Sequence, residues 1–191
     1  MTGALILVSY VLGSIPTGLW LGLRLKGVDI REHGSKNIGA TNTMRTLGKG
    51  LGAVALLGDM AKGALPVLVL GPLSDWEYAP LACGLAAIAG HTWSLFLKFN
   101  GGKGVATSAG VFLGLAPIPM AIAIGVFVVV VGVTRMVSAG SILAAMALGA
   151  MIWILPHDPV LRGIATAVAV LVVLRHRDNI KRIMTGTESR L

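Results

Sequence analysis

Residues 105–134, VATSAGVFLGLAPIPMAIAIGVFVVVVGVT, decide how often the chain crosses a membrane. This run carries no charged residue and is longer than the roughly 20 residues of one span. Pro117 and Pro119 interrupt it, and proline breaks a helix interior. We therefore predict a turn at Pro117-Ile118-Pro119 between two short helices of about 12 and 15 residues. At 1.5 Å per residue, both underspan a hydrocarbon core of roughly 30 Å.

Five more apolar runs lie at 1–23, 51–73, 79–97, 137–155 and 159–174. The 191 residues are 55% hydrophobic and 13% charged, with a mean hydropathy of +0.83. A soluble domain is about 25% charged, so a soluble enzyme, a disordered tail and a disulfide-stapled module are excluded. We expect an all-α polytopic membrane protein with seven transmembrane helices, two of them short. They form one integral membrane domain over 1–191, with the first run retained as a span.

The basic residues predict the orientation of these helices. Fourteen of the sixteen Lys and Arg lie in loops 24–50 and 98–104, at Arg135 and in the tail 175–191. Cytoplasmic segments are enriched in Lys and Arg, so we expect all four to face the cytoplasm, with the N-terminus outside. The net charge of +8 then reflects topology and anionic substrates or lipids rather than nucleic acid.

The first polar segment is Gly34-Ser35-Lys36-Asn37-Ile38-Gly39-Ala40-Thr41-Asn42-Thr43-Met44-Arg45. Glycines free backbone N–H groups to form an anion nest, and hydroxyl, amide and cationic side chains add donors. This mixture favours a phosphate site, although a glycine-rich turn with helix caps is the alternative. The candidate ligands are Ser35, Asn37, Gly39, Thr41, Asn42 and Arg45.

The second segment, Asn100-Gly101-Gly102-Lys103-Gly104, leads directly into the apolar run that begins at Val105. A glycine loop before a helix N-terminus presents N–H groups and the positive dipole end to an anion. We interpret it as a phosphate cradle, with a flexible cytoplasmic turn as the alternative. Its candidate ligands are Gly101, Gly102, Lys103, Gly104, Thr107 and Ser108.

The third segment is His176-Arg177-Asp178-Asn179-Ile180-Lys181-Arg182, followed by Glu188. On a helix, His176 and Asn179 share a face. The histidine could act as an acid or base or bind phosphate, and the cations could bind anions. The alternative is a basic tail that contacts anionic headgroups.

Ionisable residues inside the second and third apolar runs are Asp59 and Lys62, three apart, and His91. Intramembrane charges are costly and suggest function, but a neutralising pair and a helix–helix hydrogen bond are the structural alternatives. The sequence contains no His-x-x-x-x-Asp, no Gly-x-Ser-x-Gly and no Cys/His cluster suited to zinc. A covalent serine mechanism or a metal mechanism therefore has little support.

With these segments in this order, the chain resembles the bacterial acyl-phosphate:glycerol-3-phosphate acyltransferase family. The resemblance runs through Gly13–Gly18, Gly34–Arg45, Gly58-Asp59, Gly90-His91, Asn100–Ser108, His176–Arg182 and Glu188. It implies transfer of a fatty acyl group from acyl phosphate to the 1-hydroxyl of glycerol 3-phosphate. The products are lysophosphatidic acid and phosphate, and no acyl-CoA, acyl carrier protein, cofactor or metal takes part.

The resemblance also implies residue roles. It makes Ser35, Arg45, His176 and Asn179 catalytic, the glycine loop the glycerol 3-phosphate site, and Glu188 structural, as we expect of Asp59. Lys36 departs from the family pattern, which favours a small residue there, often glycine. The implied partners are the two substrates and membrane lipids, for a monomer in the bacterial cytoplasmic (inner) membrane with its active site facing the cytoplasm.

Two other functions compete with this interpretation. A small organic-anion transporter would suit the short helices and the Asp59–Lys62 pair, but it needs access from both sides of the membrane. A headgroup-binding structural protein would need only runs of Lys and Arg. For the acyltransferase we expect direct transfer, with the hydroxyl proton taken either by His176 or by a substrate phosphate.

Overall fold

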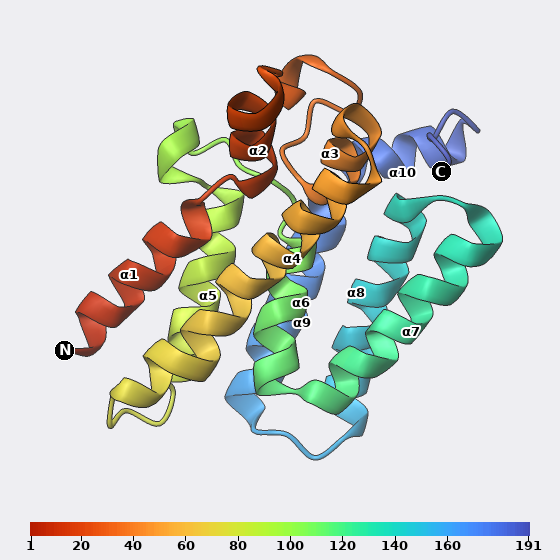
Figure 1. Cartoon of the computed structure of the whole chain (residues 1–191). Coiled ribbons are helices and arrows are strands. Elements are labelled where there is room, and N and C mark those ends of the chain that lie inside the picture. The colour runs from red at the N-terminus through yellow and green to blue at the C-terminus, as the bar shows by residue number, and fades with distance from the viewer. The chain divides into compact units, whose positions relative to one another are not determined.

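The computed structural model describes residues 1–191, which form helices and connecting turns without any strand. This confirms the all-α prediction. The chain divides into two compact units, Met1–Leu115 and Ala116–Leu191 (Figure 1).

The first unit contains six α-helices and four short helical turns. In chain order they are α1 (Thr2–Ser14), α2 (Thr17–Lys26), η1 (Ile30–Glu32), α3 (Ala40–Leu47), α4 (Lys49–Leu65), η2 (Pro66–Leu70), η3 (Gly71–Leu73), α5 (Ala79–Thr92), η4 (Leu95–Leu97) and α6 (Val105–Leu115). Figure 1 shows α2, α3 and the η4 turn at one end of this unit, and the connection between η3 and α5 at the other.

The first apolar run is two helices rather than one, because the chain breaks at Pro16. The axes of α1 and α2 differ by 47°. Proline has no N–H to continue the hydrogen-bond ladder, so carbonyl groups at the break lack their usual helical partners. Lys62 on α4 donates to one of them, the Ile15 carbonyl, at 2.6 Å.

Glycines let the helices of the first unit approach closely. A side chain on Gly13 or Gly90 would overlap backbone atoms where α1 crosses α5. Similarly, a side chain on Gly63 or Gly110 would overlap backbone atoms where α4 crosses α6. Small residues at such contacts are the usual device of membrane helix packing.

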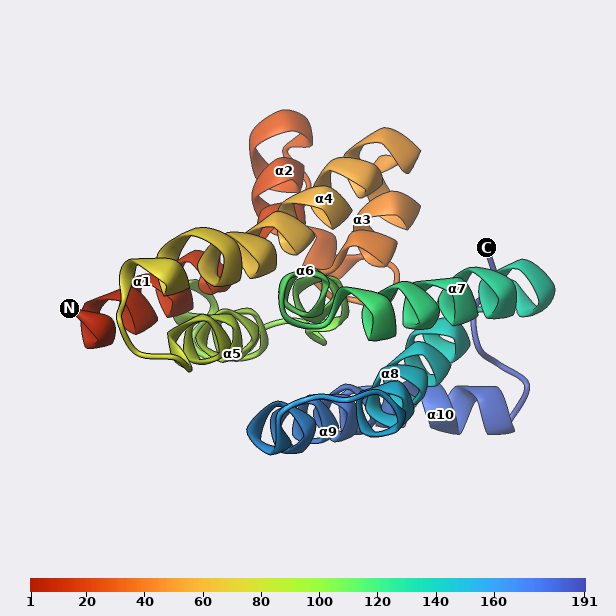
Figure 2. The ribbon, with the colours of Figure 1, turned by 90° about the horizontal axis from the view of Figure 1, so that it is seen from below.

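The second unit contains α7 (Pro117–Thr134), α8 (Val137–Ile154), α9 (Pro159–Leu174) and α10 (Arg177–Met184). Helix α8 packs against both α7 and α9 (Figure 2). The Asp158 carboxylate caps α9 by accepting from the Val160 N–H at 2.7 Å. At its other end α9 turns by 54° into α10.

Four to six of the seven predicted spans are candidate membrane spans in the structure. Four are long and apolar enough to cross a membrane, the two bent pairs bring the number to six, and α6 is a shorter apolar helix of 11 residues. Helix α7 also differs from expectation: it has 18 residues instead of about 15, and it is long enough to cross a membrane, so it is not a short helix as predicted. Pro117 and Pro119 start α7 instead of preceding it, since proline is well tolerated in the first turn.

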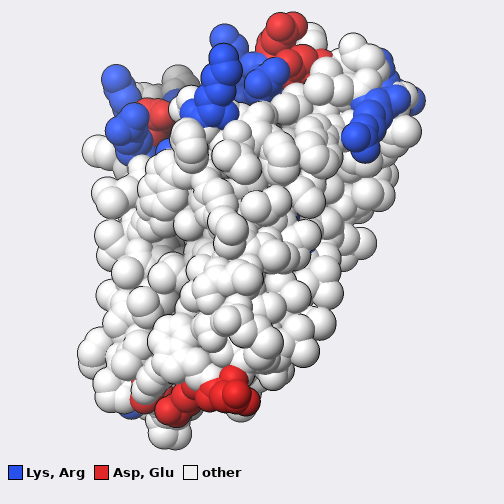
Figure 3. Space-filling model, turned by 90° about the vertical axis from the view of Figure 1, so that its left-hand side faces the viewer, with Lys and Arg blue, Asp and Glu red and all other residues white.

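Charge is distributed unevenly over the first unit. Figure 3 faces its α1–α5 side and shows Lys and Arg gathered near one end, acidic side chains also at the opposite end, and a broad uncharged band between them. An uncharged belt between charged ends is the surface expected of a protein that spans a bilayer.

Candidate active site

The glycine loop folds back over the end of α5. The Gly101 N–H donates to the Thr92 carbonyl at 3.1 Å, and the Gly102 N–H donates to the His91 carbonyl at 2.9 Å. A side chain on Gly101 would overlap that same His91 carbonyl. Both glycines are therefore required by close packing, in addition to any role toward a ligand.

Three buried hydroxyl groups belong to the last turn of α5 and the first turn of α6, which the glycine loop connects. Thr92 Oγ1, Thr107 Oγ1 and Ser108 Oγ have no hydrogen-bond partner in the protein. A methyl group built on Gly104, whose φ is +82°, would lie 3.4 Å from Thr92 Oγ1 and 3.8 Å from Ser108 Oγ. A buried hydroxyl without a partner costs about 1–3 kcal/mol, so such groups call for a ligand or an ordered water.

Thr92 is a candidate that the sequence analysis missed. It is fully buried and lies in the last turn of α5, directly after His91. The available signal was a polar residue closing an apolar helix just before a glycine loop. The predicted ligands Thr107 and Ser108 are also buried, in the first turn of α6, and Lys103 is half-buried in the loop.

The first polar segment is organised by Asn42, a buried residue of α3. Its amide nitrogen donates to the carbonyls of Ile30 at 2.8 Å, His33 at 3.2 Å and Asn37 at 2.9 Å. Its amide oxygen accepts from the Ser35 N–H at 2.9 Å. One side chain thus fixes the whole loop, and this geometry favours a scaffolding role for Asn42.

Other donors of this segment are used within it as well. The Lys36 N–H donates to the His33 carbonyl, and the Gly39 N–H donates to Asn37 Oδ1, both at 2.9 Å. These groups do not form an open anion nest. The side chains of Ser35 and Arg45 are exposed, and Thr41 lies one turn before Arg45 on the same face of α3.

A small apolar core joins the first segment to the chain that leads into the glycine loop. Leu19, Ile30 and Ile38 are buried together, and Leu47 and Leu97 pack against them. Because Leu97 lies in η4, just before the glycine loop, the two predicted phosphate-binding segments share one support at one end of the first unit.

The third segment lies in the second unit, at the bend between α9 and α10. His176 is 3% exposed, and its Nδ1 lies 2.7 Å from the Val172 carbonyl. A carbonyl only accepts, so Nδ1 carries the proton and Nε2 is the basic nitrogen of the neutral ring. Asn179, one turn later, is also buried.

Glu188 ties the end of the chain to this bend. Its carboxylate accepts from Asn179 Nδ2 at 2.6 Å, Ser138 Oγ at 2.7 Å and Arg182 Nε at 2.7 Å. Burial opposes ionisation, but these three hydrogen bonds and the Arg182 charge outweigh it and lower the pKa of Glu188. Glu188 therefore acts as a clasp that orients Asn179. Ser138 is fifty residues away from Glu188, and nothing in the sequence identified it as a partner of this carboxylate.

The Asp59–Lys62 pair is buried in α4, with 2.7 Å between Lys62 Nζ and Asp59 Oδ1. The same carboxylate oxygen accepts from Thr17 Oγ1 at 3.0 Å. The pair therefore fastens α4 to the break between α1 and α2. This geometry favours the structural interpretation of Asp59.

Residues 3–186 match a family model described as glycerol-3-phosphate acyltransferase. The chain belongs to this family. It is 49% identical to the glycerol-3-phosphate acyltransferase of Geobacter sulfurreducens over 183 residues, which are 96% of the chain and 94% of that relative. It is 42% identical to the enzyme of the same name from Fusobacterium nucleatum, over 97% of the chain and 95% of that relative.

Two crystal structures of PlsY (YgiH), an integral membrane glycerol 3-phosphate acyltransferase, share the fold of this acyltransferase. Their glycerol 3-phosphate and lysophosphatidic acid forms match with TM-scores of 0.94 and 0.91. Both are 34% identical and cover all of this chain and 95% of the PlsY chain. The predicted family is thereby confirmed, and with it a membrane enzyme that acylates glycerol 3-phosphate in phospholipid synthesis.

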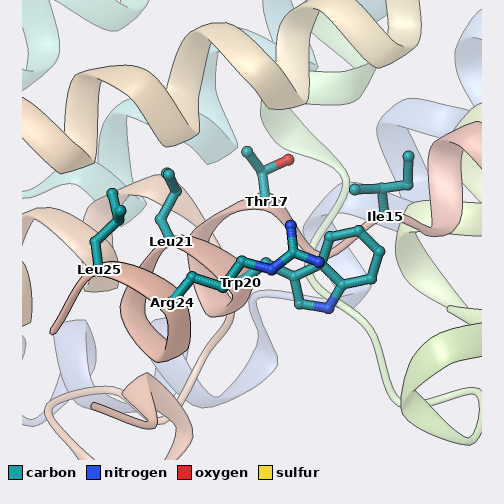
Figure 4. Close-up of a pocket in the computed structure, with 6 residues that line it drawn as sticks. All are labelled: Ile15, Thr17, Trp20, Leu21, Arg24 and Leu25. Carbon is teal, nitrogen blue, oxygen red and sulfur yellow. The ribbon is translucent and has the colours of Figure 1, made fainter. Parts of the chain in front are cut away.

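An open groove of about 230 Å³ lies beside the Pro16 break of this acyltransferase. Its walls are Ile15, Thr17, Trp20, Leu21, Arg24 and Leu25 (Figure 4). The Arg24 guanidinium carbon lies 5.2 Å from the centre of the Trp20 ring. The groove thus combines apolar walls, the Trp20 ring among them, with one cation.

Proposed function

We propose that this acyltransferase uses acyl phosphate as its donor and transfers the acyl group directly to the 1-hydroxyl of glycerol 3-phosphate. The hydroxyl oxygen attacks the acyl carbonyl carbon, a new ester bond forms, and the acyl–oxygen bond to phosphate breaks. Phosphate leaves with the electron pair, and the products are lysophosphatidic acid and inorganic phosphate. The donor is already activated, so the protein mainly aligns the reactants and stabilises developing charge without cofactor or metal.

The observation that carries this proposal is the glycine loop with its three buried hydroxyls without partners. In the proposal Lys103, the backbone of Gly104 and the hydroxyls of Thr92, Thr107 and Ser108 bind the phosphate of glycerol 3-phosphate. Gly101 and Gly102, whose N–H groups already donate to carbonyls of α5, shape the loop. A phosphate brings several acceptor oxygens, so it would satisfy these hydroxyl donors and meet the positive end of α6.

The first segment supplies the second set of ligands. Ser35, Thr41 and Arg45 bind and orient the acyl phosphate, while Asn37, Gly39 and Asn42 hold the loop in shape. This division follows from the hydrogen bonds within the loop, because an amide that already bonds four backbone groups has little capacity left for a ligand.

His176 and Asn179 complete the proposed catalytic set. Since Nδ1 of His176 donates to the Val172 carbonyl, Nε2 is the ring nitrogen that we propose as base, and a phosphate oxygen of the substrate is the other candidate to take the hydroxyl proton. Glu188 fixes Asn179 in this arrangement.

The proposal places the enzyme as a monomer in the bacterial cytoplasmic membrane. The 191 residues form one domain, with loops 24–50 and 98–104 and tail 175–191 on the cytoplasmic side and the N-terminus outside. The positions of the basic residues support this orientation. The groove at Trp20 is our candidate for the acyl chain of the donor, with Arg24 near the membrane surface.

The test is phosphate release by the purified protein from palmitoyl phosphate, with and without glycerol 3-phosphate, in EDTA. We expect release that requires glycerol 3-phosphate, survives EDTA and falls at least about tenfold in Lys103→Ala. Lys98→Ala removes an equal charge from the same segment and is the matched control. An inactive wild-type protein, or equal effects of both variants, would overturn the proposal, and flux of glycerol 3-phosphate into vesicles without chemistry would indicate a transporter.

A further inference from the structure

His91 occupies a position between the glycine loop and the buried ion pair. It lies in the last turn of α5 and is 4% exposed. One edge of its ring faces Gly102, and Nδ1 on the opposite edge lies 3.9 Å from Asp59 Oδ1. The His91 ring therefore lies between Gly102 and Asp59, which are far apart in the sequence.

His91 contacts the glycine loop through its backbone carbonyl and through its imidazole ring. The His91 carbonyl accepts from the Gly102 N–H at 2.9 Å. A methyl group on Gly102 would meet Nε2, Cε1 and Cδ2 of His91 as its three nearest neighbours, and it would overlap Nε2. The imidazole thus forms the surface on which the loop rests just before Lys103.

On its other side the His91 ring lies next to Asp59, whose carboxylate is itself held in place by two partners. Asp59 binds Lys62 and Thr17, and Lys62 donates to the Ile15 carbonyl at the Pro16 break. A buried ion pair adds little stability in net terms, but breaking one is expensive, so the position of Asp59 is well determined. The ring consequently has a rigid support behind it.

We propose that His91 is a positioning residue that sets the geometry of the Gly101–Lys103 turn. It acts through the loop and not on the substrate itself. The inference rests on the proposed function, in which the loop holds the phosphate of glycerol 3-phosphate. Correct placement of a binding group within about 1 Å decides much of an enzyme's efficiency, so removing this support raises the KM for that substrate.

The competing interpretation is that His91 only packs the core. A packing role predicts less folded enzyme with unchanged KM, whereas a positioning role predicts a specific change in KM. Two conservative variants separate the ring's edges. Gln carries a polar atom at about the reach of Nε2, beside Gly102, while Asn reaches only as far as Nδ1 and leaves the loop side empty.

The experiment measures kcat and KM for both substrates, and glycerol 3-phosphate affinity by calorimetry, in detergent-purified protein. We expect His91→Ala and His91→Asn to raise KM and Kd for glycerol 3-phosphate about tenfold or more, with kcat and the KM for palmitoyl phosphate within about threefold. His91→Gln should restore most of the affinity. Melting curves report the folded fraction of each variant.

A double-mutant cycle with Gly102→Ala gives the sharpest result. Alone, this substitution clashes with the ring and should raise KM about tenfold; in the His91→Ala background the clash is absent, and it should add less than about twofold. Additive effects, or variants that lose kcat at unchanged KM and Kd, would overturn the proposal. Failure of wild-type protein to turn over palmitoyl phosphate would overturn the donor assignment instead, because the calorimetric comparison does not use the donor.

Discussion

The loop at residues 30–45 and the glycine loop at 100–104 differ in where their polar groups find partners. Asn42 satisfies three carbonyls and one N–H within the first loop. Around the glycine loop, by contrast, Thr92, Thr107 and Ser108 keep buried hydroxyls without protein partners. The backbone of the first loop is thus satisfied within the loop, whereas in our proposal a ligand completes the second. Mutations should therefore affect stability at one loop and affinity at the other.

The strongest test of this contrast is Asn42→Ala, which leaves four backbone groups without their partner. Each buried group left unsatisfied costs about 1–3 kcal/mol, so the loop should lose its shape. We expect activity to fall at least about 100-fold and the melting temperature to drop clearly. Kinetics and melting of the purified variant check both effects.

The matched control is Asn100→Ala in the glycine loop. The exposed Asn100 amide makes one hydrogen bond, at 3.2 Å to the Lys98 carbonyl. Little change is expected there in either measurement. If Asn42→Ala melted like the wild type and raised only a KM, Asn42 would be a substrate ligand, as the sequence predicted, and not a scaffold.

The second test is Thr92→Val, which should lower the affinity for glycerol 3-phosphate without lowering stability. Valine has nearly the shape of threonine without the hydroxyl, so it removes a buried polar group that has no partner. We expect the melting temperature to stay the same or rise, while KM for glycerol 3-phosphate increases about tenfold. Thr92→Ser, which keeps the hydroxyl, is the control, and a lower melting temperature with unchanged KM would contradict the prediction.

The sequence predicted the all-helical membrane fold, the division of 105–134 into two helices and the family. Those depend on apolar runs, proline and motif order, which are local. Contacts across the chain were not predictable: Thr92 beside Gly104 and Ser138 on Glu188 depend on how helices pack. The role of Asn42 could not be separated from a ligand role either, since amide groups serve both purposes and only the geometry distinguishes them.

At the bend between α9 and α10, the charged carboxylate of Glu188 has the role that the Asn42 amide has in the first loop. Its lowered pKa means that the folded state favours the carboxylate. The resulting stabilisation is complete above the ordinary glutamate pKa and is lost as the pH falls through the lowered folded value. Glu188→Gln should cost about 1–3 kcal/mol at neutral pH and lose this acid dependence.

Melting temperatures of wild type and Glu188→Gln between neutral and acidic pH provide the measurement. The two curves should converge as the pH falls. Glu77→Gln changes an exposed carboxylate and should leave the curve unaltered. A constant difference in melting temperature between Glu188→Gln and wild type at every pH would show that the stabilisation by Glu188 does not depend on its ionisation.

The smallest expected effect concerns Lys36, where the resemblance led us to expect a small residue. Its φ is +58°, in the left-handed region that costs a side-chain-bearing residue about 1–2 kcal/mol and costs glycine nothing. Lys36→Gly relieves this strain but adds freedom to the unfolded chain, which offsets about 0.4–1 kcal/mol. A net gain of about 0.5 kcal/mol, or about 1–2 °C in melting temperature, is expected with activity within about twofold. The control is Lys26→Gly, at the last residue of α2, which should lower the melting temperature instead. Equal shifts of the melting temperature in both variants would mean that the backbone at Lys36 is not strained.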